Sequence, residues 1–405
     1  MTEKALIMDG KKHCDVVVEP ARLSGSIAAI PSKSYAQRIL IATALASWFG
    51  RPPEVPLNYL SDDVKVCVAA LKSLYGTKRD VEVMGSTFRS INCGESGTVA
   101  RLLLPIATAL IEQGTLTGEG SLLTRPFETF CSSLEQGGRI HFDQYTLPLS
   151  WKGRLQPGTY YLPGDESSQY VSALLFALPL LSATSTITLT SPLESAGYVD
   201  MTLDVLQQFG ISSSYDSATR TYTIDPQQYR YPDTMSVEGD WSNSAFWLAA
   251  DLEVTGLKSD SLQRDRSFLQ VKDQRVIDAT DIPDLVPILS VYAALRVGTT
   301  CIHGIERLRI KESDRIKTTL AMLQALGCNA ELRASEGEEL LIHGTATIPG
   351  GTVDGANDHR IVMAAAIAAS FAEKPVTIQG AQAVAKTYAR FFADFKQLGG
   401  RVHVV

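Results

Sequence analysis

Cationic side chains occur in this sequence beside hydroxyls and glycines, in short motifs suited to binding a small anion. The motif PSKSYAQR begins at Pro31 and places Lys33 and Arg38 on the first turns of an expected helix, which Ser32 can cap. Free backbone N–H groups at a helix N-terminus bind anions, and charged donors strengthen the hydrogen bonds. Taken alone, a capped helix with two solvated cations is the simpler interpretation.

Similar motifs follow in the first half of the chain. Residues 93–98 read CGESGT and precede Arg101; Gly97 removes a side chain at a helix start and lets a ligand approach the backbone. Arg125 adds a cation just before another expected helix, and residues 164–169 (GDESSQ) offer two hydroxyls and an amide. Neither GxGxxG after a strand nor GxxxxGK[ST] is present, so the sequence does not indicate a nucleotide site.

The second half contains four charged motifs at expected helix starts. Residues 309–315 read RIKESDR, which is unremarkable for a solvated helix start. Residues 357–360 (NDHR) lead straight into an apolar helix, where a charged quartet is costly unless it faces a cleft. Residues 386–388 (KTY) precede the last helix, and residues 281–287 (DIPDLVP) place two carboxylates where an apolar helix begins.

The candidate cations are four in each half: Lys33, Arg38, Arg101 and Arg125, then Lys311, Arg315, Arg360 and Lys386. Cations at helix N-termini oppose the helix dipole, so stability alone does not favour them. Convergence on one shared anion explains the pattern. We therefore expect a small, multiply charged ligand bound between the two halves. The net charge of −7 argues against a general nucleic-acid or membrane-surface binder.

The composition is ordinary for a globular protein and gives no sign of a metal site. A length of 405 residues predicts two domains or one elaborate domain. The six histidines and six cysteines form no ligand cluster and no CxxC pair, so we expect no metal. The N-terminus has no signal-peptide pattern, and the longest apolar runs are too short to span a bilayer. These observations favour a cytoplasmic location.

A weak internal repeat organises the elements that carry these motifs. Helical patterns that end in a glycine recur with spacings of 62, 72, 117 and 72 residues, and the 117-residue gap is roughly two periods. Six units of this length fill the chain. Glycine provides the left-handed conformation that ends a helix. Plausible strands follow Gly210, Gly327 and Gly400, so the pattern indicates an α/β class. The glycines are Gly76, Gly138, Gly210, Gly327 and Gly399.

A second kind of helix begins with small polar residues and then turns strongly apolar. Five segments have this pattern: residues 32–47, 95–110, 166–181, 242–252 and 357–372. Their apolar bodies predict burial inside the units. Their N-termini are therefore the places where backbone N–H groups can meet an anionic ligand.

Taken together, the motifs resemble those of 5-enolpyruvylshikimate-3-phosphate (EPSP) synthases over essentially the whole chain. The ordered set is PSKSxxxR, GxSGTxxR, RP, SSQ, SxxYxxMT, DxPDLVP, KESDR, NDHR and AKTY. The resemblance implies an α/β (α+β) fold, a two-domain inside-out α/β barrel of six repeated βαβαββ-like units, three per domain. It also implies a discontinuous domain of residues 1–22 and 239–405 and an inserted domain of residues 23–238. The crossovers are expected near residues 22–25 and 236–240.

The resemblance implies two ligand sites and no cofactor. Shikimate 3-phosphate is expected to contact Lys33, Ser34, Arg38, Ser167, Ser168, Gln169, Ser195, Tyr198, Asp284 and Lys311. Phosphoenolpyruvate is expected to contact Lys33, Glu95, Gly97, Arg125, Gln169, Arg315, Arg360 and Lys386. The catalytic residues are expected among Asp284, Glu312, Lys33 and Lys386. The partners are these two small molecules, with no nucleic acid and no membrane, and we expect a monomer.

The reaction that the resemblance implies is transfer of an enolpyruvyl group by addition and then elimination. Asp284 is our choice for the base at the 5-hydroxyl of shikimate 3-phosphate, and Glu312 or Lys386 for the acid. Glu95 stands where relatives commonly have asparagine, and a carboxylate beside a phosphate is unfavourable unless paired or protonated. Pro31 and Ala389 also replace a frequent glycine and a frequent proline, which indicates a divergent branch.

Three alternatives remain open. The first is the sister enzyme that transfers enolpyruvate to a UDP-amino sugar; Ser34, where that enzyme has asparagine, and the absence of cysteine from Gly114–Thr124 argue against it. The second is a non-catalytic phosphate-ester binder, which needs the cations but neither Asp284 nor Glu312. The third is a purely structural repeat protein, which leaves the charges on buried helices unexplained.

Overall fold

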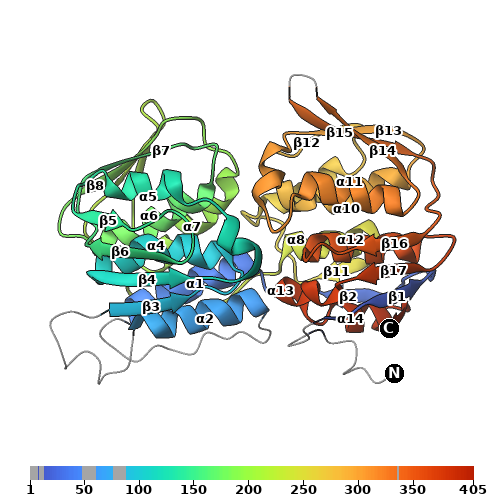
Figure 1. Ribbon diagram of the computed structural model, residues 1–405, viewed down its shortest axis with the longest axis horizontal. Helices are drawn as coiled ribbons and strands as arrows, with labels where there is room; N and C mark the ends of the chain where they lie inside the picture. The colour runs from blue at the N-terminus through green and yellow to red at the C-terminus, as the bar shows by residue number, and fades with distance from the viewer. Residues whose placement is uncertain (1–7, 9–12, 48–60, 76–87, 335–336) are drawn as a thin grey trace. The chain divides into compact units, whose positions relative to one another are not determined.

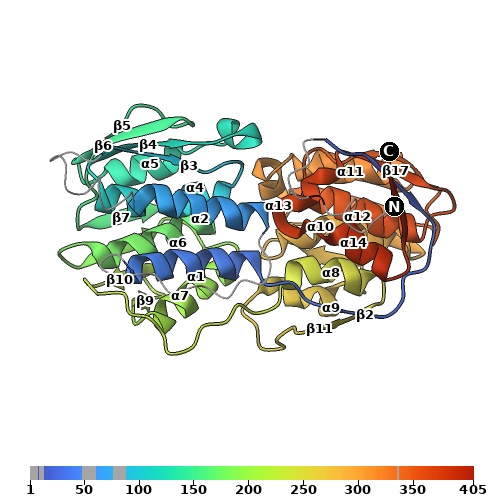
Figure 2. The same cartoon turned by 90° about the horizontal axis from the view of Figure 1, so that it is seen from below.

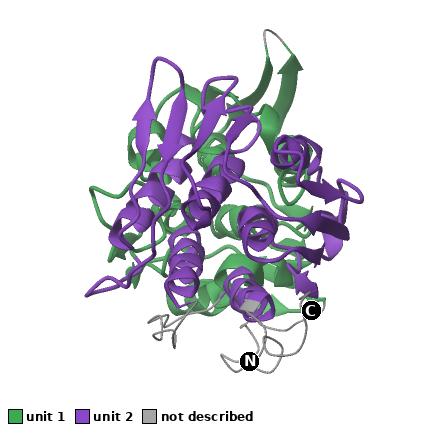
Figure 3. Ribbon diagram, turned by 90° about the vertical axis from the view of Figure 1, so that its left-hand side faces the viewer, with its two compact units in different colours: residues 1–32, 238–405 green, residues 33–237 purple. Residues whose placement is uncertain are grey.

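The computed structural model describes residues 8, 13–47, 61–75, 88–334 and 337–405. The chain forms two compact units, shown in Figure 3. Unit 1 contains residues 1–32 and 238–405, and unit 2 contains residues 33–237. The chain thus leaves unit 1 after Ser32 and returns to it at Glu238.

Unit 2 alternates helices with short strands (Figure 1). Its elements are α1 (Lys33–Ala46), α2 (Asp62–Tyr75), β3 (Phe88–Asn92), α4 (Gly97–Leu110), β4 (Gln113–Thr117), η2 (Gly120–Thr124), α5 (Glu128–Glu135), β5 (Ile140–Phe142), β6 (Leu149–Gly153), β7 (Thr159–Leu162), α6 (Ser168–Ala177), η3 (Leu178–Leu180), β8 (Ser185–Leu189), α7 (Ala196–Gln208), β9 (Ser214–Asp216) and β10 (Thr221–Ile224).

Unit 1 is built in the same alternating manner from both ends of the chain. Its elements are β1 (Val16–Glu19), β2 (Ser26–Ala28), α8 (Trp241–Ala249), β11 (Glu253–Thr255), η4 (Arg264–Ser267), α9 (Phe268–Val271), β12 (Val276–Asp278), η5 (Pro283–Leu285), α10 (Val286–Ala294), β13 (Gly298–His303), η6 (Glu306–Ile310), α11 (Arg315–Ala325), β14 (Asn329–Ala334), β15 (Glu338–Gly344), β16 (Gly351–Asp354), α12 (His359–Ser370), β17 (Val376–Gln379), η7 (Ala381–Val384), α13 (Ala385–Tyr388), α14 (Phe391–Gln397) and β18 (Arg401–Val404).

The same sheet topology occurs four times among the described residues. The strand orders are β3-β4-β6-β5 and β7-β8-β10-β9 in unit 2, and β12-β13-β15-β14 and β16-β17-β1-β18 in unit 1. In each sheet the first pair is parallel and the other two pairs are antiparallel. The parallel pair of β2 and β11 is separate. This recurrence is the structural form of the repeat predicted from the glycine spacing, and it accounts for four of the six expected units.

Apolar helices fill the interior of each unit, and the sheets cover them. The bodies of α4, α6 and α12 are almost entirely buried, as their sequences predict. Strands such as β8 and β10 alternate fully buried with partly exposed residues, so one face of each sheet packs inward. Helix α4 packs on α6, and α10 on α12 (Figures 1 and 2). The fold is therefore the inside-out α/β arrangement expected from the sequence.

Glycines in the left-handed region end several helices. Gly138, Gly210, Gly327 and Gly399 have φ values of 67°, 77°, 79° and 95°, which L side chains rarely adopt. These four positions confirm the helix-ending role predicted for them. Gly76, the remaining member of the series, lies outside the described residues.

Two boundaries differ from the sequence expectation. The expected boundary between residues 22 and 23 falls ten residues before the division after Ser32, because β2 pairs with β11 and so belongs to unit 1. The second expected boundary, between residues 238 and 239, differs by one residue. Helix α5 begins at Glu128 with Phe127 as its N-cap, so Arg125 lies before the helix, as expected.

No helix among the described residues is both long enough and apolar enough to cross a membrane.

Candidate active site

Two helix N-termini of unit 1 position its arginines. Asp314 is the N-cap of α11 and accepts a hydrogen bond from the backbone N–H of Lys317. Asp358 is the N-cap of α12 and accepts one from the backbone N–H of Arg360 at 2.9 Å. Capping carboxylates satisfy backbone N–H groups that have no partner inside the helix. These caps fix the helix starts from which Arg315 and Arg360 extend.

Arg315 is buried and surrounded by carboxylates. Its side chain is 1% exposed, and its guanidinium pairs with Asp284 at 2.6 Å and with Asp358 at 2.8 Å. It also pairs with Glu312, three residues earlier in the chain. A buried charge is tolerated when it is paired and hydrogen-bonded in this way. Arg315 therefore holds Asp284 and Glu312, two of the predicted catalytic carboxylates, beside one guanidinium.

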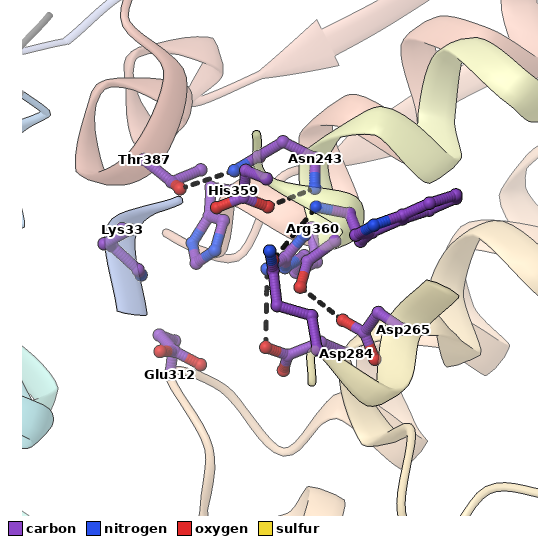
Figure 4. A network of polar contacts seen from close by, with 12 residues as sticks. Lys33, Asn243, Asp265, Asp284, Glu312, His359, Arg360 and Thr387 are labelled. Atoms are coloured by element: carbon purple, nitrogen blue, oxygen red, sulfur yellow. Dashed lines mark hydrogen bonds and ion pairs between the residues drawn. The ribbon is translucent and has the colours of Figure 1, made fainter. Parts of the chain in front are cut away.

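Arg360 has the same carboxylate as a partner but keeps unused donors. Its Nη2 lies 3.3 Å from Asp284 Oδ2 (Figure 4). Its guanidinium lies 5.9 Å from the ring centre of Phe246. Its Nε and Nη1 are buried and have no hydrogen-bond partner among the described residues. Buried donors are rarely left unsatisfied in folded proteins. Arg360 can therefore bind an anion that completes its hydrogen bonding.

The charges of this cluster set the protonation of its members. Burial by itself raises the pKa of Asp284. The charges of Arg360, Arg315 and Lys311 outweigh burial, so the pKa of Asp284 lies well below its usual range. Burial lowers the pKa of Lys311 to about 8; Asp284 opposes this shift, and Arg307 and Arg315 add to it. Asp284 is thus ionised near neutral pH, whereas Lys311 titrates just above it.

Lys386 and a buried acid lie at the edge of this cluster. Lys386 donates to the backbone carbonyl of Asn357 at 2.8 Å, which ties α13 to the turn before α12. Its neighbour Thr387 accepts from Asn243 of α8 at 3.0 Å (Figure 4). Asp265 is 4% exposed and accepts from the hydroxyl of Ser242. Burial, followed by the charge of the Asp284 carboxylate, raises the pKa of Asp265 to about 7.

In unit 2, the start of α1 carries the predicted phosphate ligands. Lys33 pairs with Asp63 of α2 at 2.9 Å. Arg38 is 1% exposed and donates to Thr202 Oγ1 at 2.8 Å and to the carbonyl of Tyr198 at 3.0 Å. It also donates to the carbonyl of Ser34, four residues earlier in the helix. Arg38 therefore connects α1 with α7, which carries Tyr198.

A second group of unit 2 surrounds Gly97 at the start of α4. A Cβ atom added to Gly97 would lie 2.6 Å from Arg125 Nη1 and 3.0 Å from Arg101 Nη1. Both guanidiniums thus occupy the space that a side chain would need. Arg101 donates to Gln169 Oε1 at 3.1 Å, and Gln169 Nε2 donates to Thr98 at 2.9 Å. These bonds fix the orientation of the Gln169 amide.

The backbone at the starts of α6 and α7 positions the hydroxyls of the serines predicted to bind the ligand. Ser167 is the N-cap of α6 and accepts from the backbone N–H of Gln169, while Ser168 is buried in the first turn. Ser195 caps α7 with a φ of 52°, a strained conformation for a residue with a side chain. Such strain is often kept at ligand sites.

Glu95 packs against the backbone at Gly120. A Cβ atom at Gly120, whose φ is +55°, would lie 2.6 Å from the carboxyl carbon of Glu95. Gly120 is the first residue of η2, and Arg125 is the C-cap of this element. Glycine at this position thus makes room for the carboxylate of Glu95.

The structure brings the predicted residues together within each unit. In unit 1, Asp284, Glu312, Arg315 and Arg360 share direct ion pairs, and Lys311 interacts with them electrostatically. In unit 2, two groups form: Ser34, Arg38 and Tyr198, and separately Gly97, Arg125 and Gln169. No cluster of metal-ligating side chains occurs in the part of the chain that the structure describes.

Several polar residues were not assigned to either ligand or to a catalytic step from the sequence. Asp358 and Arg101 belong to motifs that were recognised, so their positions carried a signal. Thr387 belongs to the AKTY motif, and Asn243 to the polar start of the 242–252 segment. Asp265 carried no signal, because a single polar residue beside apolar helices has no distinctive spacing.

Comparisons with known proteins identify the family. A family model described as EPSP synthase (3-phosphoshikimate 1-carboxyvinyltransferase) matches residues 17–273 and 250–395. A protein of Clostridium acetobutylicum named 3-phosphoshikimate 1-carboxyvinyltransferase is 39% identical, covering 96% of this chain and 98% of its own. One of the same name from Clostridium kluyveri is 37% identical, covering 96% and 98%.

A solved structure has the same fold. The EPSP synthase of Acinetobacter baumannii superposes with a TM-score of 0.74 at 20% identity, covering 97% of this chain and 100% of that one. At this identity the likeness supports the fold, whereas the sequence relatives and the family model decide the membership. This chain belongs to the EPSP synthase (3-phosphoshikimate 1-carboxyvinyltransferase) family.

Proposed function

We propose that this protein is the enzyme that transfers the enolpyruvyl group of phosphoenolpyruvate to the 5-hydroxyl of shikimate 3-phosphate and releases phosphate. The reaction belongs to the biosynthesis of chorismate and aromatic amino acids. Family membership supports the activity. The observation that carries the chemistry is the ion-paired cluster in which Asp284 contacts both Arg315 and Arg360.

Phosphoenolpyruvate is a small polyanion and needs several cations. In unit 1, Arg360 can bind its carboxylate or phosphate in bidentate fashion, Arg315 adds a buried positive charge beside it, and Lys386 adds a point charge. The unused donors of Arg360 support this assignment. In unit 2 the contacts are assigned to Lys33, Glu95, Gly97, Arg125 and Gln169. Glycine at position 97 lets the guanidiniums of Arg125 and Arg101 approach the start of α4, where they can bind the ligand.

Shikimate 3-phosphate is assigned to hydroxyls and cations at helix starts. In unit 2 these residues are Lys33, Ser34, Arg38, Ser167, Ser168, Gln169, Ser195 and Tyr198. In unit 1 they are Asp284 and Lys311. The buried position of Arg38 supports a role in binding a phosphate, because a guanidinium held by neutral acceptors keeps its full positive charge available.

The chemistry consists of an addition followed by an elimination. An acid, Glu312 or Lys386, protonates the methylene carbon of phosphoenolpyruvate, which becomes a methyl group. Asp284 takes the proton of the 5-hydroxyl while the oxygen of this hydroxyl bonds to the central carbon of phosphoenolpyruvate. The product of this step is a tetrahedral intermediate. The bond from this carbon to the phosphate oxygen then breaks. Phosphate leaves, and the methyl group returns a proton to the deprotonated acid (Glu312 or Lys386), which restores the double bond in the enol ether product.

Deuterium incorporation tests this sequence of steps. Because the methylene carbon passes through a methyl group, turnover in deuterium oxide should place deuterium on the vinyl carbon of the product. Proton NMR and mass spectrometry of the product measure this directly. A product free of deuterium would contradict an addition that begins with protonation of the methylene carbon.

We also propose that the protein acts on these two small molecules as a monomer in the cytoplasm. Sedimentation velocity at micromolar protein concentration, with and without both substrates, should give the mass of one chain. A stable dimer would correct this part of the proposal and leave the chemistry unaffected.

A further inference from the structure

The two segments through which the chain leaves and re-enters unit 1 pair with each other. The backbone N–H of Ser32 donates to the carbonyl of Glu238 at 2.8 Å, and that of Asp240 donates to the carbonyl of Ile30 at 2.8 Å. Pro31 and Gly239 form an antiparallel bridge between these bonds. The short ladder is thus the last structure of unit 1 before Lys33, the first residue of unit 2.

The side chain of Gln263 holds both of these segments. It is 5% exposed and lies just before η4. Its Oε1 accepts from Ser32 Oγ at 3.2 Å and from the backbone N–H of Trp241 at 3.0 Å. Its Nε2 donates to Glu238 Oε1 at 2.6 Å and to the carbonyl of Gly239 at 2.8 Å. Two donors and two acceptor sites are the full capacity of an amide, so Gln263 is completely used and its orientation is fixed.

The surroundings leave this arrangement little freedom. A Cβ atom at Gly239 would lie 2.6 Å from the carbonyl oxygen of Gly256 and 2.8 Å from the Cβ of Ala29. Glu238 also accepts from the hydroxyl of Ser261, so its carboxylate is held from a second direction. A buried network that is fully satisfied specifies one geometry. The two segments therefore have a defined register and separation at Gln263.

Both segments continue into residues that the proposed function uses. Ser32 directly precedes Lys33 in the chain. Trp241 starts α8, and two residues later Asn243 donates to Thr387, the neighbour of Lys386. Within unit 1, the contacts of Gln263 therefore lead through α8 to Lys386. Along the backbone, they lead directly to Lys33.

We propose that Gln263 is a positioning residue for enolpyruvyl transfer, which sets the backbone at Ser32 and Trp241 and thereby the ammonium groups of Lys33 and Lys386. This inference rests on the proposed function. Gln263 touches no reacting atom. Its effect on the reaction is geometric, and displacement of a catalytic group by about 1 Å can cost about 100-fold in rate.

The test uses Gln263→Glu, which keeps the shape and both acceptor bonds but replaces the donating nitrogen with oxygen facing Glu238. Two carboxyl groups in contact share a proton, so lowering the pH restores a donor. At about pH 8, we expect kcat to fall about 10- to 100-fold while the KM for shikimate 3-phosphate changes less than about threefold. At about pH 6, the deficit relative to wild type should shrink. Adding Glu238→Gln should restore part of the loss, because the amide introduced at position 238 can donate to the carboxylate introduced at position 263.

A matched control is available in unit 2. Gln227 also makes four hydrogen bonds with its amide, to the backbone and hydroxyl of Ser212 and to the carbonyl of Asp225. None of these partners is a predicted site residue. Gln227→Glu should leave kcat and both KM values unchanged. Thermal unfolding of every variant is measured beside the kinetics, at assay temperatures where all are folded.

The outcomes separate the inference from the function beneath it. A Gln263→Glu variant that unfolds at lower temperature but keeps the wild-type kcat has only lost stability, and the inference is overturned. It is also overturned when the pH change and the Glu238→Gln substitution both leave the loss unchanged. Wild-type protein that transfers no enolpyruvyl group overturns the proposed function and this inference with it.

Discussion

Asp284 is held in its ionised form by the same arginines that are assigned to phosphoenolpyruvate. A carboxylate with so low a pKa is a weak base in the free protein. When Arg315 and Arg360 share their charge with a bound anion, their hold on Asp284 weakens and its pKa rises. Substrate binding would thereby turn an ion-paired carboxylate into a better proton acceptor at the 5-hydroxyl.

Replacing Asp284 with asparagine keeps the shape but removes the proton acceptor. We expect kcat to fall about 100- to 10,000-fold, the usual range for a general base, with a change of less than about tenfold in the KM for phosphoenolpyruvate. Steady-state kinetics in both substrates measure this split. Asp281→Asn, at the exposed carboxylate of the same motif, is the control. Similar losses in kcat and in binding would assign Asp284 to positioning instead.

Because Lys311 titrates close to neutral pH, we expect the binding of shikimate 3-phosphate to depend on pH. Its pKa of about 8 means that its ammonium loses the charge as the pH rises through that value. Since the neutral amine no longer attracts a phosphate, kcat/KM for shikimate 3-phosphate should fall by about a factor of ten per pH unit above about pH 8. Lys311→Arg keeps its charge and should remove this fall. A fall that persists unchanged in Lys311→Arg belongs to another group.

We expect a side chain at position 97 to disturb the proposed phosphoenolpyruvate site sterically. In Gly97→Ala the new methyl group would lie 2.6 Å from Arg125 Nη1, so this guanidinium must move. We expect the KM for phosphoenolpyruvate to rise about tenfold, because charge-assisted hydrogen bonds weaken steeply when their geometry is lost. The KM for shikimate 3-phosphate should stay constant. Gly158→Ala, where a Cβ atom meets open space, is the matched control, and equal effects of both substitutions would contradict the assignment.

At the scale of single residues, the sequence predicted the site residues that belong to motifs with fixed spacing. It did not predict the isolated polar residues. KESDR and NDHR place Arg315 and Arg360 beside their caps, so proximity in the sequence already implied proximity in the structure. Gln263 and Asp265 act through partners more than twenty residues away. No local sequence pattern predicts such contacts, because the partners come together only when α8 and η4 pack against each other.

Among the elements, α12 shows how a cap and an ion pair combine. Asp358 is fully buried, caps the helix and pairs with Arg315. By contrast, Asp314 caps α11 from a partly exposed position and pairs with Arg309. The two aspartates have the same local role and differ in what burial adds to it.

Removing these caps should have unequal costs. Asp358→Ala should lower the free energy of unfolding by about 3–5 kcal/mol, because it leaves the buried Arg315 short of a partner. Asp314→Ala should cost about 1 kcal/mol, the value of an ordinary N-cap. Urea denaturation followed by circular dichroism measures both. Equal costs would show that the pairing of Asp358 with Arg315 contributes nothing beyond the cap.

Helix type was more predictable than helix length or boundary. The apolar bodies of α4, α6 and α12 announced buried helices, because an element that is apolar on all sides must be covered. The brief α9 and α13 have four residues each and offer no periodicity to detect. Their ends depend on neighbouring elements and not on their own sequence.

For the whole molecule, the sequence predicted the repeat, but it did not predict the exact residue at which the chain passes from unit 1 to unit 2. The recurrent glycines end their helices in the left-handed conformation, which is a local requirement, so the sequence alone reveals them. The first boundary depends on the pairing of β2 with β11, which are separated by more than two hundred residues. Likewise, β1 completes a sheet with β17 and β18 from the other end of the chain. Such long-range pairings have no local signature.

The most direct test of the account measures phosphate released by the purified protein from phosphoenolpyruvate. Shikimate 3-phosphate and UDP-N-acetylglucosamine are supplied as acceptors in separate reactions. We predict release with shikimate 3-phosphate alone, in a one-to-one ratio to the enol ether formed. Release with the UDP-sugar alone would contradict the acceptor assignment, and release with neither would show that the protein binds phosphate esters without transferring the enolpyruvyl group.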